Sequence, residues 1–186
     1  EAHNNLGNTL LTIGRLDDAV KSYEKTLTLK PDYPEAHNNL GIAFQKLGQL
    51  DAAVKSFEEA LTIKPDYDKA HSNLGNVLKE LGQLDAAVKS FEKALTINPN
   101  YAEAHSNLGN VLKELVQMDD AVKSYKKALA INPNYAEAHN NLGAIFKELG
   151  QLDDAVKSYR KALAINPDYV VAQNNLDIAL KELSSW

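Results

Sequence analysis

The chain has no cysteine, and no apolar run among its 186 residues approaches the roughly 20 residues of a membrane-spanning helix. A disulfide framework, a thiolate metal site and a cysteine nucleophile are therefore excluded, although the compartment is not fixed by this. The formal net charge of -5 gives no overall attraction to nucleic acid or to an anionic membrane, and neither is expected as a partner. Gly-rich phosphate loops, serine elbows and Cys–His pairs are also missing. We therefore predict no enzymatic activity, no cofactor and no bound metal.

The sequence begins at Glu1 rather than at a methionine and shows no signal peptide. We interpret it as a piece excised from a longer protein, so missing targeting signals carry little weight. The compartment stays open, with a slight preference for the cytoplasm.

The chain does contain a 34-residue unit that repeats along its whole length. Glu35–Asp68 reads EAHNNLGIAFQKLGQLDAAVKSFEEALTIKPDYD, and Lys69–Ala102 follows it closely. Such a chain is built from stacked modules that each contact only their neighbours. We predict a single array with repeats at 1–34, 35–68, 69–102, 103–136 and 137–170, followed by a C-terminal capping helix at 171–186.

Each repeat is expected to form two helices, as the unit Lys69–Ala102 shows. Its first half has apolar residues on one helical face, namely Ala70, Leu74, Val77, Leu78 and Leu81. Its second half has a similar stripe, namely Leu84, Ala87, Val88, Phe91, Ala94 and Leu95. Gly82 between the halves suits a left-handed helix C-terminus, and Pro99 ends the second helix. The fold class is therefore expected to be all-α.

Local signals refine this expectation. Asp85 is expected to cap the second helix, and Asn100 with Glu103 to form a capping box before the next one. Val116 stands where the other repeats have the turn glycine, and a β-branched residue disfavours positive φ, so this turn is expected to be either reshaped or strained. A glycine recurs inside each first helix, as at Gly75, which predicts tight packing of a neighbouring helix there.

These residues resemble the tetratricopeptide repeat (TPR) family over essentially the whole chain. The family pattern appears in one unit as His71, Leu74, Gly75, Leu78, Ala87, Phe91, Ala94 and Pro99. The resemblance implies an α-solenoid in which antiparallel helix pairs form a right-handed superhelix and the first helices line a concave groove. The repeats are most similar to those of the O-linked N-acetylglucosamine transferase repeat arm, although no catalytic domain is present.

One asparagine precedes the Leu of the family pattern in each first helix, on the side opposite the apolar stripe. The six are Asn5, Asn39, Asn73, Asn107, Asn141 and Asn175. Neighbouring modules about 10 Å apart would present one carboxamide to every third residue of an extended peptide, which advances about 3.3 Å per residue. Each amide can donate to and accept from a peptide group whatever the side chains are. Alternatively, these amides bond within the array or only to water.

Two further sets are candidate ligand contacts. Asparagines three residues farther along occur as Asn8, Asn76 and Asn110. The resemblance makes these part of a carboxylate clamp, but that clamp also needs a preceding lysine, and none is present, so clamp behaviour is not expected. Lysines that could attract an acidic ligand occur as Lys79, Lys113 and Lys147. A glutamate follows each of them directly, and solvated charge at the helix end is the simpler interpretation.

A histidine also recurs once per repeat, as His3, His37, His71, His105 and His139. Neighbours about 10 Å apart cannot share a zinc ion, which holds its ligand nitrogens at about 2.1 Å, so packing between modules is favoured.

The sequence therefore predicts a protein–protein interaction scaffold that binds an extended peptide or a partner helix in a concave, Asn-lined groove. One alternative is a substrate-recruiting arm cut from a larger enzyme such as a glycosyltransferase. Another is a structural array that associates with itself end to end through apolar terminal faces.

Overall fold

All regular structure in residues 2–185, the part of the chain that the computed structural model describes, is α-helical. The eleven helices of this part are α1 (Ala2–Thr12), α2 (Leu16–Leu29), α3 (Pro34–Lys46), α4 (Leu50–Ile63), α5 (Asp68–Glu80), α6 (Leu84–Ile97), α7 (Ala102–Glu114), α8 (Met118–Ile131), α9 (Ala136–Glu148), α10 (Leu152–Ile165) and α11 (Val170–Leu183). Odd-numbered helices are the first helices of the repeats, and even-numbered helices are the second. The all-α prediction is confirmed, with the helices packed as antiparallel pairs.

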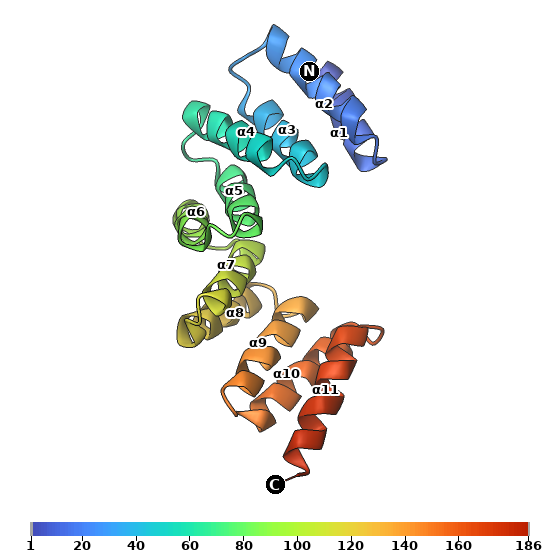
Figure 1. The fold of residues 1–186 in the computed structure, drawn as a ribbon, viewed down its shortest axis with the longest axis vertical. Coiled ribbons are helices and arrows are strands. Elements are labelled where there is room, and N and C mark those ends of the chain that lie inside the picture. Colours follow the sequence, from blue (N-terminus) through green and yellow to red (C-terminus); the bar gives the residue numbers. More distant parts are fainter. Residues whose placement is uncertain (1, 186) are drawn as a thin grey trace. The chain divides into compact units, whose positions relative to one another are not determined.

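The helices fall into two compact units, α1–α6 up to Pro99 and α7–α11 from Asn100. In the first unit, α1 packs on α2, α3 on α4 and α5 on α6, and successive first helices also touch (Figure 1). The second unit repeats this arrangement, with α11 covering one side of α10. The exact division into repeats stays a prediction. None of the helices within residues 2–185 combines the length and the apolar composition needed to cross a bilayer.

The turn inside each repeat is closed by a residue in the left-handed region. Around Gly82, the Gly82 N–H donates to the Lys79 carbonyl at 2.9 Å and the Gln83 N–H to the Leu78 carbonyl at 2.8 Å. This pair of bonds is the Schellman motif. Val116 forms the same turn with φ of 60°, so its turn is strained rather than reshaped.

Each second helix ends just before its proline, as predicted. Asn98, for example, has φ of -128°, and its N–H donates the last helical bond to the Ala94 carbonyl. A residue that precedes proline is pushed into extended conformations, which explains the abrupt end.

The capping predictions were wrong. The residue before α6 is Gln83 and the residue before α7 is Tyr101, and neither makes a side-chain cap hydrogen bond. Asp85 lies inside the first turn of α6, where a negative charge still interacts favourably with the helix dipole.

The core of each repeat is an aromatic ring pressed against a glycine of the facing helix. A Cβ added to Gly75 would lie 2.9 Å from the Phe91 ring, and one added to Gly7 would lie 2.5 Å from the Tyr23 ring. Phe91 and Tyr23 are completely buried. The predicted close approach at the first-helix glycines is therefore present, because any larger residue would collide with the ring.

Candidate functional site

The asparagine row has one residue on each first helix. In the first unit it comprises Asn5 (α1), Asn39 (α3) and Asn73 (α5), and in the second unit Asn107 (α7), Asn141 (α9) and Asn175 (α11). Asn5 is exposed and the other five are half-buried. Side chains in this state can hold a fixed orientation and still meet a ligand.

Within each unit, row asparagines hydrogen-bond to the preceding repeat. In the first unit, Asn39 Nδ2 donates to Asn8 Oδ1 at 3.0 Å and Asn73 Nδ2 donates to Asn38 Oδ1 at 2.9 Å. These bonds join first helices that are neighbours in space but about one repeat apart in sequence. The carboxamides therefore link modules while remaining partly exposed.

The second unit repeats the pattern. Asn141 Nδ2 donates to Asn110 Oδ1 at 3.1 Å, and Asn175 Nδ2 donates to Asn140 Oδ1 at 3.0 Å. Because the same geometry appears in both units, it is a property of the repeat rather than of one location.

The acceptor comes from either of two positions on the preceding first helix. Asn8 and Asn110 lie three residues after the row asparagine of their own helix, whereas Asn38 and Asn140 lie directly before it. The second choice occurs where the later position carries no acceptor, as at Ile42 and Ala144. Sequence reasoning assigned Asn8 and Asn110 to ligand contacts and gave no role to the earlier position. The sequence contains a signal for this role. Where the residue three positions after the row asparagine is apolar, the residue directly before the row asparagine is itself an asparagine.

Tyrosines of the second helices complete this network. The Tyr23 hydroxyl donates to Asn8 Oδ1 at 2.8 Å, and the Tyr125 hydroxyl donates to Asn110 Oδ1. Each of these acceptor oxygens therefore receives two bonds, one from its own repeat and one from the next. Burial raises the pKa of Tyr23 to about 12, so the phenol stays a donor at neutral pH.

Part of the hydrogen-bonding capacity of the row remains. An asparagine side chain has two N–H donors and a carbonyl oxygen with two lone pairs. Asn73 and Asn175 each use one N–H, and their other polar groups have no partner among residues 2–185. Each amide therefore presents a donor and an acceptor in an orientation that is already fixed.

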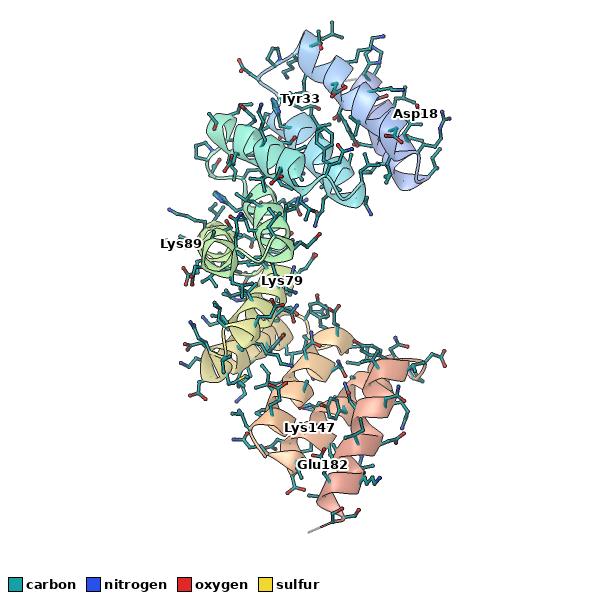
Figure 2. The ribbon with its side chains drawn as sticks, viewed as in Figure 1. Asp18, Tyr33, Lys79, Lys89, Lys147 and Glu182 are labelled. Carbon is teal, nitrogen blue, oxygen red and sulfur yellow. The ribbon has the colours of Figure 1, made fainter. Side chains whose placement is uncertain are left out.

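The lysine row is tied to the following repeat. Lys113 Nζ lies 2.7 Å from Glu148 Oε1, and Lys147 Nζ lies 3.5 Å from Glu182 Oε1. Figure 2 labels Lys147 and Glu182, which come from the neighbouring first helices α9 and α11. The glutamate that follows each lysine in sequence thus contacts a side chain of the preceding repeat. Gln45 Nε2, for example, donates a hydrogen bond to Glu80 Oε1 at 2.5 Å. Lys79 is half-buried on α5, and Asn76 and Asn107 are half-buried on α5 and α7. A ligand carboxylate would have to displace Glu148 or Glu182 to reach Lys113 or Lys147.

The recurring histidines hydrogen-bond to the segments that connect one repeat to the next. Nε2 of His37, His71 and His139 lies 2.9 Å from the carbonyl oxygen of Pro31, Pro65 and Pro133, respectively. A carbonyl only accepts hydrogen bonds, so Nε2 carries the proton. This bond joins the end of one repeat to the first helix of the next, which is the packing role that the spacing favours.

Comparison with known proteins identifies the repeat. A family model described as TPR repeat matches residues 7–48, 75–116 and 117–150. Two further models described as tetratricopeptide repeat match residues 34–67 and 136–169, and residues 56–89. A comparison with curated proteins found no match.

Several solved structures share the fold. A crystal structure of MamA is 27% identical, with a TM-score of 0.79, over 88% of this chain and 96% of MamA. YrrB, described as a TPR protein with an unusual peptide-binding site, is 26% identical, with a TM-score of 0.74, over 92% of this chain and 89% of YrrB. TTC0263, a thermophilic TPR protein of Thermus thermophilus, is 28% identical, with a TM-score of 0.76, over 96% of this chain and 97% of its own. The family models alone match more than half of the residues, and the chain belongs to the tetratricopeptide repeat family.

Proposed function

We propose that this chain is an interaction scaffold whose asparagine row binds the backbone of an extended peptide from a partner protein. The observation that carries the proposal is the fixed, half-exposed carboxamide. Asn73 and Asn175 each spend one N–H on the preceding repeat and keep a donor and an acceptor for a ligand. A pre-oriented side chain loses less conformational entropy on binding than a free one.

The spacing of the row suits a peptide main chain. Packed helices lie about 8–10 Å apart, and an extended peptide covers that distance in about three residues. Within each unit, one carboxamide per repeat would then meet a peptide group at regular intervals. Recognition through the backbone gives affinity with little dependence on side chains, so we expect a sequence-tolerant ligand. YrrB, which shares the fold, is described as having a peptide-binding site.

The residues proposed to contact the peptide are those of the asparagine row. At the edge of the row, the further candidates are Asn8, Asn76, Asn110, Lys79, Lys113 and Lys147. The lysines are expected to contribute least, because Lys113 and Lys147 already pair with Glu148 and Glu182. Acidic C-terminal tails are therefore not favoured over neutral segments.

The test separates ligand contact from module linkage. Asn73→Ala with Asn175→Ala removes two row amides together with their links to the preceding repeat. Asn38→Ala with Asn140→Ala removes the same two links from the acceptor side and leaves both row amides in place. Both double variants should lose similar stability, about 0.5–1.5 kcal/mol per hydrogen bond.

Clones from a displayed library of random peptides, selected on the unmodified chain, provide the ligand. Their dissociation constants should rise at least about tenfold for the row variant and only about threefold or less for the matched control. Equal losses in both variants, or none in the row variant, would overturn the proposal, and so would a library that yields no binder.

Two alternative roles are a recruiting arm of a larger enzyme and an array that associates with itself end to end. No contact among residues 2–185 supports either of them. A recruiting arm predicts a catalytic domain encoded in the same gene. An end-to-end array predicts a light-scattering mass that grows with protein concentration.

A further inference from the structure

A groove of about 860 Å³ opens between the second helices of two neighbouring repeats, α8 and α10, with residues of α9 at its base. Its side walls come from the second helices and its base from α9, and none of the residues of the asparagine row lines it. All its walls belong to the unit α7–α11. The asparagine-row proposal makes no use of this groove.

The floor of the groove and part of its walls are apolar. Leu142 and Phe146 of α9 line it together with Leu129 of α8 and Ile165 of α10. Leu142 is buried, and the other three are half-buried and keep surface that can meet a ligand. Apolar surface of this kind gains about 25 cal/mol for each Å² that a partner covers.

The rim is basic. Lys126, Lys157 and Lys161 line the groove with one carboxylate, Asp154. Lys157 Nζ pairs with Asp154 at 3.2 Å, which leaves Lys126 and Lys161 without an ion-pair partner among residues 2–185. Lys126 Nζ lies 6.0 Å from the centre of the Phe146 ring, so positive charge stands directly over the apolar floor.

The repeats supply an internal comparison. The position of Lys126 is occupied by Glu24, Glu58 and Glu92 in the three preceding repeats. Because the scaffold accepts glutamate there, the lysine is not a requirement of the fold. The change from glutamate to lysine makes this rim basic in a chain whose net charge is negative.

The walls of the groove also differ from the equivalent positions of the earlier repeats, because they are less polar. Ala130 and Ala164 line the groove where the first three repeats have Thr28, Thr62 and Thr96. Those threonines bond to carbonyl oxygens of their own helices, as Thr62 does with Glu58 at 2.9 Å. Replacing them by alanine removes polar atoms from the walls, so this groove is both more basic and more apolar than its counterparts.

The groove has the length of a short helix. The α10 wall is a helical stripe of Asp154, Ser158, Lys161 and Ile165, which spans three turns and therefore about 16 Å. A third helix fits between two neighbouring helices by packing its ridges into the groove that they form.

We propose that the α8/α10 groove docks an amphipathic helix of a partner protein, with an apolar stripe on the floor and carboxylates against Lys126 and Lys161. Charge complementarity selects the acidic flanks, and the apolar floor supplies most of the buried area. The site is a second binding surface, separate from the asparagine row in both residues and ligand chemistry.

The test uses a displayed library of helical peptides of about 15–18 residues, long enough to form a helix on the surface. The library carries a fixed stripe of leucines and randomised flanking positions. Clones selected on the unmodified chain should carry aspartate or glutamate beside the stripe. Lys126→Glu with Lys161→Glu should weaken them at least about tenfold, which is about 1.4 kcal/mol.

The matched control is Lys127→Glu with Arg160→Glu. It makes the same change in net charge on the same two helices, at residues that do not line the groove, and should alter affinity by no more than about threefold. Ala130→Thr with Ala164→Thr should also weaken binding without any change in charge. All substituted residues have precedents in equivalent repeats, so the variants are expected to fold, and circular dichroism verifies this.

Three results would overturn the inference. The first is a set of selected clones with neutral or basic flanks. The second is an equal loss of affinity in the groove and control pairs, which would indicate a general charge effect. The third is loss of the selected clones on Asn73→Ala with Asn175→Ala, which would move them to the asparagine row.

Discussion

Val116 has a left-handed backbone conformation, and the equivalent residue in each of the other four repeats is glycine. Its φ is 60°, against 73° to 80° for the four turn glycines. The hydrogen bonds of the turn are unchanged, since the Val116 N–H donates to the Lys113 carbonyl and the Gln117 N–H to the Leu112 carbonyl, both at 2.9 Å. The fold therefore imposes the left-handed conformation on a β-branched residue. We predict that Val116→Gly stabilises the protein.

The magnitude follows from three contributions. A left-handed conformation costs a non-glycine residue about 1–2 kcal/mol, which glycine avoids. Glycine loses about 0.5–1 kcal/mol more chain entropy on folding. The side chain of Val116 is 74% exposed, so its removal loses only a few tenths of a kcal/mol of burial. The expected net gain is about 0.5 kcal/mol.

Urea unfolding followed by circular dichroism measures this gain. With a slope of about 1–3 kcal/mol per molar urea, the midpoint should rise by about 0.2–0.5 M at an unchanged slope. Val116→Ala is the control, because it removes the branched side chain and keeps the unfavourable φ. If Val116→Gly were no more stable than Val116→Ala, the strain argument would be refuted. Gly82→Val should show the opposite effect in the preceding repeat.

Three further outcomes are expected. Gly75→Ala should lose at least about 1 kcal/mol in urea unfolding despite the better helix propensity of alanine, because the new Cβ would lie 2.9 Å from the buried Phe91 ring; a gain would contradict this. Burial raises the pKa of Tyr23 to about 12, so the folded chain keeps a proton that the unfolded chain releases above about pH 10. Stability should therefore be full below pH 10 and fall toward pH 12, and Tyr23→Phe should make that fall shallower in urea midpoints measured across the range. Lys147→Ala should cost less than about 1 kcal/mol, and less still in 1 M salt, because both partners of its pair with Glu182 are partly exposed; a loss above 2 kcal/mol would show that the pair does more than a surface ion pair.

Some of the local chemistry could not be derived from one repeat. Asp85 and Asn100 have the residue types of helix caps, yet α6 begins at Leu84, two residues before the start that an Asp85 cap would give, and α7 begins at Ala102, one residue after the start that an Asn100 cap would give. The start of each helix is fixed by how its apolar face meets the neighbouring helix. That packing outweighs a cap, which contributes about 1 kcal/mol.

The candidate site divides in the same way. The 34-residue period predicts that one row asparagine recurs on each first helix, and helical geometry predicts that they all lie on the same side. The hydrogen-bond partners of these asparagines could not be predicted, because Asn73 bonds to Asn38 and Asn39 bonds to Asn8 only once two first helices are side by side. The α8/α10 groove was missed for a related reason. Its residues are spread over three helices, and each looks like an ordinary surface lysine or alanine in its own repeat.

The sequence by itself determined the period, the helix pairs, the close packing at the first-helix glycines and the proline ends. These depend on residues within one repeat, where steric exclusion and helical periodicity leave a single arrangement. Only the tertiary structure decided that Val116 is forced into the left-handed region, that the carboxamides link successive modules, and that a basic rim faces an apolar floor. The turn at Val116 lies within one repeat, but its sequence allowed both a reshaped and a strained turn, and the backbone geometry decided between them. The other two features depend on distances between residues of different repeats, which are set by how whole helices pack.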